Sequence, residues 1–244
     1  MRKLQLKTML LMLLLAVGGL SPAWADNIYT QDYEGDVTAD GLGWKTGTSG
    51  RFNPTILEES TNHFLTVDQS TRNNNGATVT GTELSGKVTA GTDFTLIFDM
   101  RLSSSNNQTN TEFIIKDAAN SGNLLSLKET GTWATTWTLN GTSTQVTLPN
   151  SNKAGGSNTI ADVDWCTYKL TRSGTLTFLT ITNTSTDAVI LERTLLTNVS
   201  ETGGLGNIQF LSSRYYANFA IDNIIQVSQV PNLPVLIDKF RRND

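Results

Sequence analysis

The 244-residue sequence predicts an all-β fold in which two antiparallel sheets pack face to face, a β-sandwich of the jelly-roll type. Two observations predict it. Almost nothing after residue 26 has the 3.6-residue period of a helix; apolar residues instead alternate with polar ones or form short β-branched runs between stretches rich in Gly, Asn and Ser. About fourteen such runs follow one another, in a length typical of one all-β domain.

The first 25 residues have the three parts of a secretory signal peptide. A basic start precedes the apolar run Thr8–Leu20, and Ala23-Trp24-Ala25 forms a small-x-small cleavage site. The apolar run is too short to span a membrane. We therefore expect a signal peptide over 1–25, a sandwich domain over 26–228 and a proline-containing C-terminal tail or linker over 229–244. The protein would be secreted: extracellular, at the cell surface or periplasmic.

The strands can be placed in order along the chain. In the segment 93–102, Phe94, Leu96, Phe98 and Met100 share one face by the period-two rule. The sequence Arg172-Ser-Gly-Thr175 predicts a tight hairpin. Long polar loops at 69–76, 103–110 and 149–162 are the places where we expect recognition. The expected strands are 27–33, 42–46, 63–68, 77–83, 93–102, 111–117, 123–128, 134–139, 143–148, 165–172, 175–183, 188–195, 207–212 and 217–227.

Charge and cysteine content narrow the function classes. Without the signal peptide, 15 Lys and Arg face 22 Asp and Glu, a net charge of −7. Such a domain is a poor binder of nucleic acid and of anionic membranes, because both need clustered basic residues. Cys166 is the only cysteine, so no intrachain disulfide forms, and its place in an alternating strand predicts a buried core thiol.

Catalytic carboxylates are not evident along any one strand. A glycosidase needs two carboxylates on either side of the bond it cleaves. Glu112 and Asp117 are five residues apart and point to opposite faces, and the adjacent Glu58 and Glu59 diverge as well. Carboxylates from different strands could still pair. The sequence contains no Gly-x-Ser-x-Gly nucleophile elbow, no His-Glu-x-x-His motif of zinc proteases and no pair of cysteines.

Acidic residues near the start of the domain suggest calcium. Asp32, Glu34, Asp36 and Asp40 lie close together among glycines, and Ca²⁺ takes six to eight oxygen ligands from flexible acidic loops. The alternative is a solvated acidic loop. Asp222 has apolar neighbours, so its charge needs a partner or an ion. If the first and last strands lie side by side, Glu34 and Asp222 could share one ion.

Aromatic residues suggest sugar binding. The C–H face of a pyranose stacks on Trp or Tyr, while nearby polar groups bind its hydroxyls. Trp133 and Trp137 are four apart in one segment, and Arg214, Tyr215 and Tyr216 form a polar turn. We take these five as candidate ligand-binding residues. The alternative is that Trp137 and one tyrosine belong to the core. Trp44 and Trp165 lie in strands and are expected to be buried.

Three short motifs resemble a known group of proteins. Tyr29–Gly35 (YTQDYEG) resembles the opening strand of secreted bacterial carbohydrate-binding jelly rolls, and Phe219–Val227 (FAIDNIIQV) resembles their closing strand. Phe94–Met100 resembles the central strand of such domains and of laminin-G-like or concanavalin A-like lectin and glucanase sandwiches. The resemblance implies a structural calcium ion on Glu34 and Asp222. The carboxylate triad of the glucanase members is missing here, which favours a binding module over a hydrolase.

Three functions therefore remain open. The first is a non-catalytic carbohydrate-binding module that stacks aromatic side chains on a polysaccharide or glycan, as part of a secreted or surface protein with possible further domains. The second is a structural or adhesive surface domain without a sugar site. The third is a polysaccharide hydrolase or lyase, which needs two facing carboxylates in a groove. Burial of all the candidate aromatic residues would remove the mechanism of the first.

Overall fold

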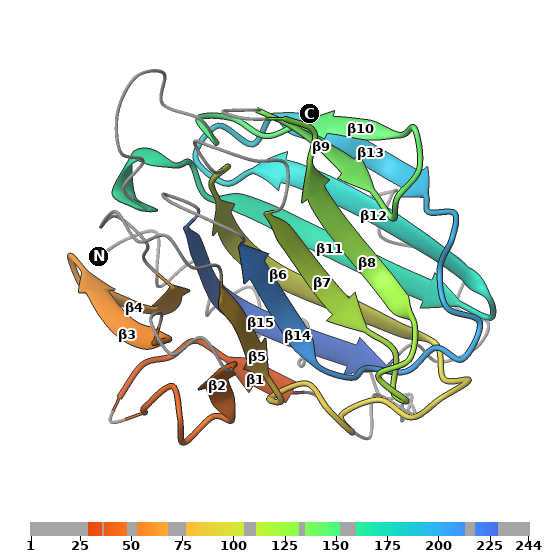
Figure 1. Ribbon diagram of the computed structural model, residues 1–244, viewed down its shortest axis with the longest axis horizontal. Helices are drawn as coiled ribbons and strands as arrows, with labels where there is room; N and C mark the ends of the chain where they lie inside the picture. The colour runs from red at the N-terminus through yellow and green to blue at the C-terminus, as the bar shows by residue number, and fades with distance from the viewer. Residues whose placement is uncertain are drawn as a thin grey trace, which may run out of the picture.

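The computed structural model describes residues 29–35, 37–47, 53–67, 77–104, 111–131, 135–151, 160–212 and 218–228. These residues form two antiparallel sheets, and a single 3-10 turn, η1 (Ile160–Asp162), is the helical element among them. Figure 1 shows the two sheets stacked one behind the other, so the predicted β-sandwich is confirmed. Within this part of the chain, no helix has the length and hydrophobicity that crossing a membrane requires.

The larger sheet, sheet A, has eight strands. β1 (Tyr29–Gln31) lies beside the C-terminal half of β15, whose N-terminal half pairs with β4. The first and last described strands are thus neighbours. Across the sheet the other strands run in the order β13 (Val189–Leu195), β12 (Leu176–Asn183), β11 (Cys166–Ser173), β6 (Phe94–Leu102), β15 (Phe219–Ser228), β4 (Asn62–Val67) and β3 (Thr55–Glu59).

The second sheet, sheet B, has seven strands, all antiparallel to their neighbours. It covers the inner face of sheet A. Its strands run in the order β10 (Gln145–Thr147), β9 (Thr136–Leu139), β8 (Asn123–Glu129), β7 (Glu112–Lys116), β14 (Ile208–Ser212), β5 (Ala77–Gly81) and β2 (Trp44–Thr46).

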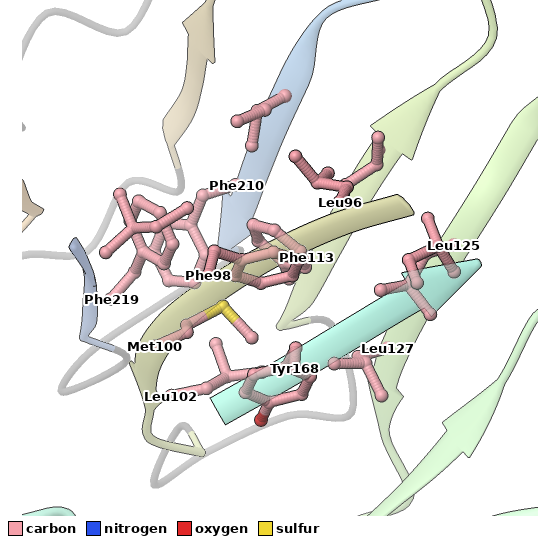
Figure 2. Close-up of a cluster of buried hydrophobic side chains, with 14 of the residues drawn as sticks. Leu96, Phe98, Met100, Leu102, Phe113, Leu125, Leu127, Tyr168, Phe210 and Phe219 are labelled. Atoms are coloured by element: carbon pink, nitrogen blue, oxygen red, sulfur yellow. The ribbon is translucent and has the colours of Figure 1, made fainter. Parts of the chain in front are cut away.

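The core lies between the sheets and is built by period-two alternation. On β6, Phe94, Leu96, Phe98 and Met100 all point inward and are at most 1% exposed, as predicted. Figure 2 shows Leu96, Phe98 and Met100 of this row beside Phe113 and Phe210 of sheet B. The rings of Phe98 and Tyr168 stack with their centroids 5.2 Å apart. Each buried aromatic side chain stabilises the fold by roughly 1.5–3 kcal/mol through the area it removes from water.

Two local predictions are confirmed. β11 and β12 form a hairpin in which Ser173 pairs with Leu176, and Gly174 in its turn has a φ of +58°, a conformation that favours glycine. Cys166 is a core thiol, 2% exposed, and burial raises its pKa to about 12.

One strand was not predicted. β3 pairs with β4 at the edge of sheet A, although its sequence, Thr-Ile-Leu-Glu-Glu, ends in two acids. Glu58 and Glu59 are both exposed, because an edge strand has one neighbour and little to cover it. The alternation that identifies a half-buried strand is therefore weak here.

Candidate functional site

One end of the sandwich gathers the ends of many strands. We call it the loop end: β6, β8 and β14 finish there, and β7, β11 and β15 begin there (Figure 1). The register shows this, since Leu102 pairs with Phe219 in sheet A and Leu211 with Glu112 in sheet B. The rings of Phe113 and Phe219, one from each sheet, stack 5.5 Å apart beneath it.

A buried layer of polar groups underlies the loop end. Ser103 and Asn218 exchange two hydrogen bonds, one from the Ser103 amide to the Asn218 carbonyl and one from the Asn218 amide to the Ser103 hydroxyl. The Ser104 amide donates to the carbonyl of Ser151 at 2.9 Å. All four residues are fully buried. Because buried polar groups need partners, these bonds fix where each chain segment leaves the core.

Four of the five predicted sugar-binding residues, Trp133, Arg214, Tyr215 and Tyr216, lie outside the described residues. Their flanks are described. Gly131 follows β8, and Asn218 precedes β15, so both segments are bounded by residues at the loop end. β8 and β14 both neighbour β7, so the two segments are anchored two strand spacings apart, about 10 Å.

The prediction for Trp137 is wrong. Its side chain is fully buried in the core, and its indole N–H donates to the Ser151 hydroxyl at 3.4 Å. The ring therefore cannot stack on a ligand. β9 begins at Thr136 and sends Trp137 inward, as the alternative interpretation of the sequence held.

Trp165 was expected to be buried, but it is only partly so. It directly precedes β11, on the outer face of sheet A at the loop end. Its ring meets the Phe64 ring edge to face, with centroids 5.3 Å apart, and the Arg101 guanidinium lies 4.6 Å from its centroid. Arg101 in turn donates to Glu59 at 2.7 Å. Ile160 of η1 packs against the same cluster.

The outward direction of two members of this cluster could have been found from the sequence. Once Cys166 is assigned to the core, alternation places its neighbour Trp165 on the opposite face. On β6, the inward row from Phe94 to Met100 likewise places Arg101 outward. Because β11 and β6 are adjacent in sheet A, these two outward-facing side chains form a cation–π pair.

The second feature of the outer face is a pair of facing carboxylates, Asp99 and Asp222, which are opposite one another on β6 and β15. The side-chain amide of Asn223 donates to both, at 3.0 and 3.1 Å. Asp222 also accepts from the Asn62 side chain and is 2% exposed. With Asp222 buried and both carboxylates accepting from Asn223, the pair takes part in hydrogen bonds that join β4, β6 and β15.

Burial raises the pKa of Asp222 to about 6, and the carboxylates of Asp99 and Asp32 add to the rise against the lowering effect of the hydrogen bonds from Asn62 and Asn223. Burial disfavours the charged form of a carboxyl group, and negative charges nearby do the same. Asp222 therefore changes its protonation state in mildly acidic solution.

Glu34, the other predicted calcium ligand, contacts His63 instead of Asp222. It accepts from the His63 amide at 3.0 Å and lies 2.8 Å from the His63 Nδ1 atom. The hydrogen bonds from His63 lower the pKa of Glu34. Within the described ranges, no three His, Cys, Asp or Glu side chains gather to hold a metal ion. The carboxylate oxygens of Glu34 and Asp222 accept hydrogen bonds within the protein, and calcium binding stays a prediction from the sequence.

Comparisons with known proteins bear on the fold. Family models and curated proteins give no match. A solved protein of unknown function from Shewanella oneidensis MR-1 aligns over 91% of this chain and 95% of its own, with 13% identity and a TM-score of 0.51. The CBM2 module of the evolved Dit protein of Lactobacillus casei BL23 phage J-1 aligns over 85% and 98%, with 11% identity and a TM-score of 0.48. Lectin II from Ulex europaeus aligns over 84% and 100%, with 8% identity and a TM-score of 0.48. At 13% identity, the likeness to the Shewanella protein shows a shared fold alone.

Proposed function

We propose that this protein is a secreted carbohydrate-binding module that holds a polysaccharide at the loop end. Trp133, Tyr215 and Tyr216 would stack on sugar rings, and Arg214 would bind hydroxyl groups. The chemistry suits the residue types, because flat rings match the C–H face of a pyranose and a guanidinium donates in a fixed plane.

What supports the proposal is where the described residues that bound the two aromatic segments lie. The residues that bound them belong to the loop end, anchored about 10 Å apart across β7. A short oligosaccharide bridges such a separation. The buried polar layer beneath fixes Asn218, one of these anchors, and a rigid scaffold under recognition loops lowers the entropy cost of binding.

A hydrolase or lyase is less well supported. Asp99 and Asp222 are a facing acidic pair, but the buried member, Asp222, already accepts hydrogen bonds from protein amides. The adhesive alternative without a sugar site predicts that no glycan binds.

The test is a glycan array followed by affinity electrophoresis on the polysaccharides that score, with the full chain expressed with its leader. We expect Trp133→Ala and Tyr215→Ala each to weaken binding at least tenfold, which is about 1.4 kcal/mol. Leu195→Ala is the matched control, because Leu195 is 48% exposed on β13, away from the loop end. Binding that neither aromatic substitution weakens would show that the site is elsewhere.

A further inference from the structure

We call one cluster on the outer face of sheet A the Trp165 platform; it consists of Trp165, Arg101, Glu59 and Phe64. Stability alone does not explain how these side chains are arranged. Arg101 is 8% exposed although it lies on the outer face of a sheet, where a long cation ordinarily reaches water. Its Nε has no hydrogen-bond partner. Leaving a buried donor unsatisfied is unfavourable by about 1–3 kcal/mol. Violations of this kind are expected where a protein keeps a group for function.

The result of that arrangement is a fixed Trp. Arg101 lies over the ring and is itself held by Glu59, while Phe64 meets the ring edge to face. The backbone carbonyl of Trp165 accepts from the Thr184 amide at 2.9 Å. The side chain is thus fixed on several sides and still partly exposed. An aromatic ring held in place before the ligand arrives loses little entropy on binding.

We infer that the Trp165 platform is a second sugar-stacking position, and that it selects neutral glycans; this inference rests on the proposed carbohydrate-binding function. The platform lies where β11 begins, at the loop end, so a chain bound there can continue across the outer face of sheet A. Glu59, whose side chain is 45% exposed, offers a carboxylate for sugar hydroxyls beside the ring.

The charge around the platform determines the class of ligand. The platform's cation, Arg101, is already paired with Glu59. Asp164 precedes Trp165 in the chain, and Asp99 pairs with Thr167 on the next strand. A uronate or sulfate ester would meet these carboxylates and, from farther off, the acidic net charge of the chain. Hydroxyl groups, in contrast, donate to carboxylates, and hydrogen bonds to charged groups are the stronger kind.

The same sheet face supplies a matched control. Phe178 on β12 is also partly exposed and also lies under a guanidinium, that of Arg193, at 4.5 Å. It pairs with Leu195 of the edge strand, far along the sheet from the loop end. Replacing Phe178 therefore removes an aromatic ring and a cation–π pair of the same kind without touching the platform.

The experiment compares the full-length wild type with Trp165→Ala, Trp165→Phe and Phe178→Ala. Binding is measured by affinity electrophoresis on neutral polysaccharides (glucans, mannans, xylans, galactans) and anionic ones (polyuronates, sulfated galactans). Thermal unfolding confirms that each variant folds. We expect binding to neutral polymers alone, weakened at least tenfold by Trp165→Ala, less by Trp165→Phe because a ring remains, and unchanged by Phe178→Ala.

The outcomes separate the inference from the function on which it rests. Binding that both Trp165 variants keep, while Trp133→Ala abolishes it, would overturn the platform and leave the proposed function standing. A preference for anionic polymers would overturn the assignment to neutral glycans. Failure of the wild type to bind any polymer would overturn the proposed function, and the platform with it. Where Trp165→Ala does not fold, Trp165→Phe decides between the same results.

Discussion

Stability should fall as the pH rises from mildly acidic to mildly basic, because of Glu83. This residue follows β5 of sheet B and is 7% exposed, and its Oε1 accepts from the hydroxyl of Tyr33, which follows β1 of sheet A, at 2.8 Å. Its Oε2 has no hydrogen-bond partner. The hydrogen bond therefore joins the two sheets at their edge, and the Glu83 carboxyl that accepts it is buried. Burial raises the pKa of Glu83 from 4.5 to about 7, against the lowering effect of the Tyr33 hydroxyl and of the neighbouring Trp44 indole.

The direction of the effect follows from proton linkage. Below pH 4.5 the Glu83 carboxyl is protonated in both the folded and the unfolded chain. Between pH 4.5 and about 7 the unfolded chain releases the proton while the folded chain keeps it, so the free energy of unfolding decreases by about 1.4 kcal/mol per pH unit. The total loss is about 3 kcal/mol, and above pH 7 to 8 it is complete. For a domain of this size that corresponds to roughly 6–12 °C in melting temperature.

The assay compares wild type with Glu83→Gln by urea unfolding from pH 4.5 to 8.5. Glutamine keeps an oxygen for the Tyr33 hydroxyl and has no charge at any of these values. Asp222, with its raised pKa, titrates in both proteins, so the difference between them isolates Glu83. Between pH 4.5 and 8.5, we expect the free energy of unfolding of Glu83→Gln to rise by about 3 kcal/mol relative to that of the wild type. A difference that does not vary with pH would refute the reasoning.

Two further predictions concern packing and calcium. A Cβ atom on Gly81 would lie 2.4 Å from the buried ring of Trp44, so Gly81→Ala should destabilise the fold by about 1–3 kcal/mol in urea unfolding, whereas Gly131→Ala, with open space around it, should be nearly neutral. The oxygens of Glu34 and Asp222 are occupied by His63 and by amide donors, so we expect added Ca²⁺ or a chelator to leave the melting temperature unchanged; a rise of several degrees with Ca²⁺ would instead establish the ion that the sequence predicts.

Alternation along strands predicted the faces of the sheets but not which aromatic residues are accessible. It placed the row from Phe94 to Met100 in the core correctly. Four alternating apolar side chains lie on one face of the strand, and burying that face is favourable. For Trp137 alternation gave a face without saying whether the face was inner or outer. That depended on which face of the β8-β9-β10 meander packs against sheet A, and the packing of the two sheets sets this face.

The platform shows the opposite situation. The sequence did contain the signal for Trp165, since its neighbour Cys166 was correctly assigned to the core. What the sequence could not show is that Arg101 and Phe64, from strands far apart along the chain, converge on that ring. The order β11-β6-β15-β4 in sheet A brings them together. Pairing between strands distant in sequence is set by the whole fold, so a site composed across strands emerges only with the topology.

The acid within the apolar closing strand has a structural explanation of the same kind. β15 changes its neighbour from β4 to β1 between Ile221 and Ile224, and its register with β6 shifts at the same place. Asn223 has a φ of +50° there, which asparagine tolerates better than most residues. Asp222 accepts from the Asn223 amide at 2.7 Å, and Asn62 at the start of β4 donates to the same carboxylate. Asp222 therefore accepts hydrogen bonds from the Asn223 backbone and from the Asn62 and Asn223 side chains at the point where β15 passes from β4 to β1. This role requires no ion. In this chain, the strand motif that resembles a metal-binding strand has a structural role, because its aspartate links neighbouring strands by hydrogen bonds.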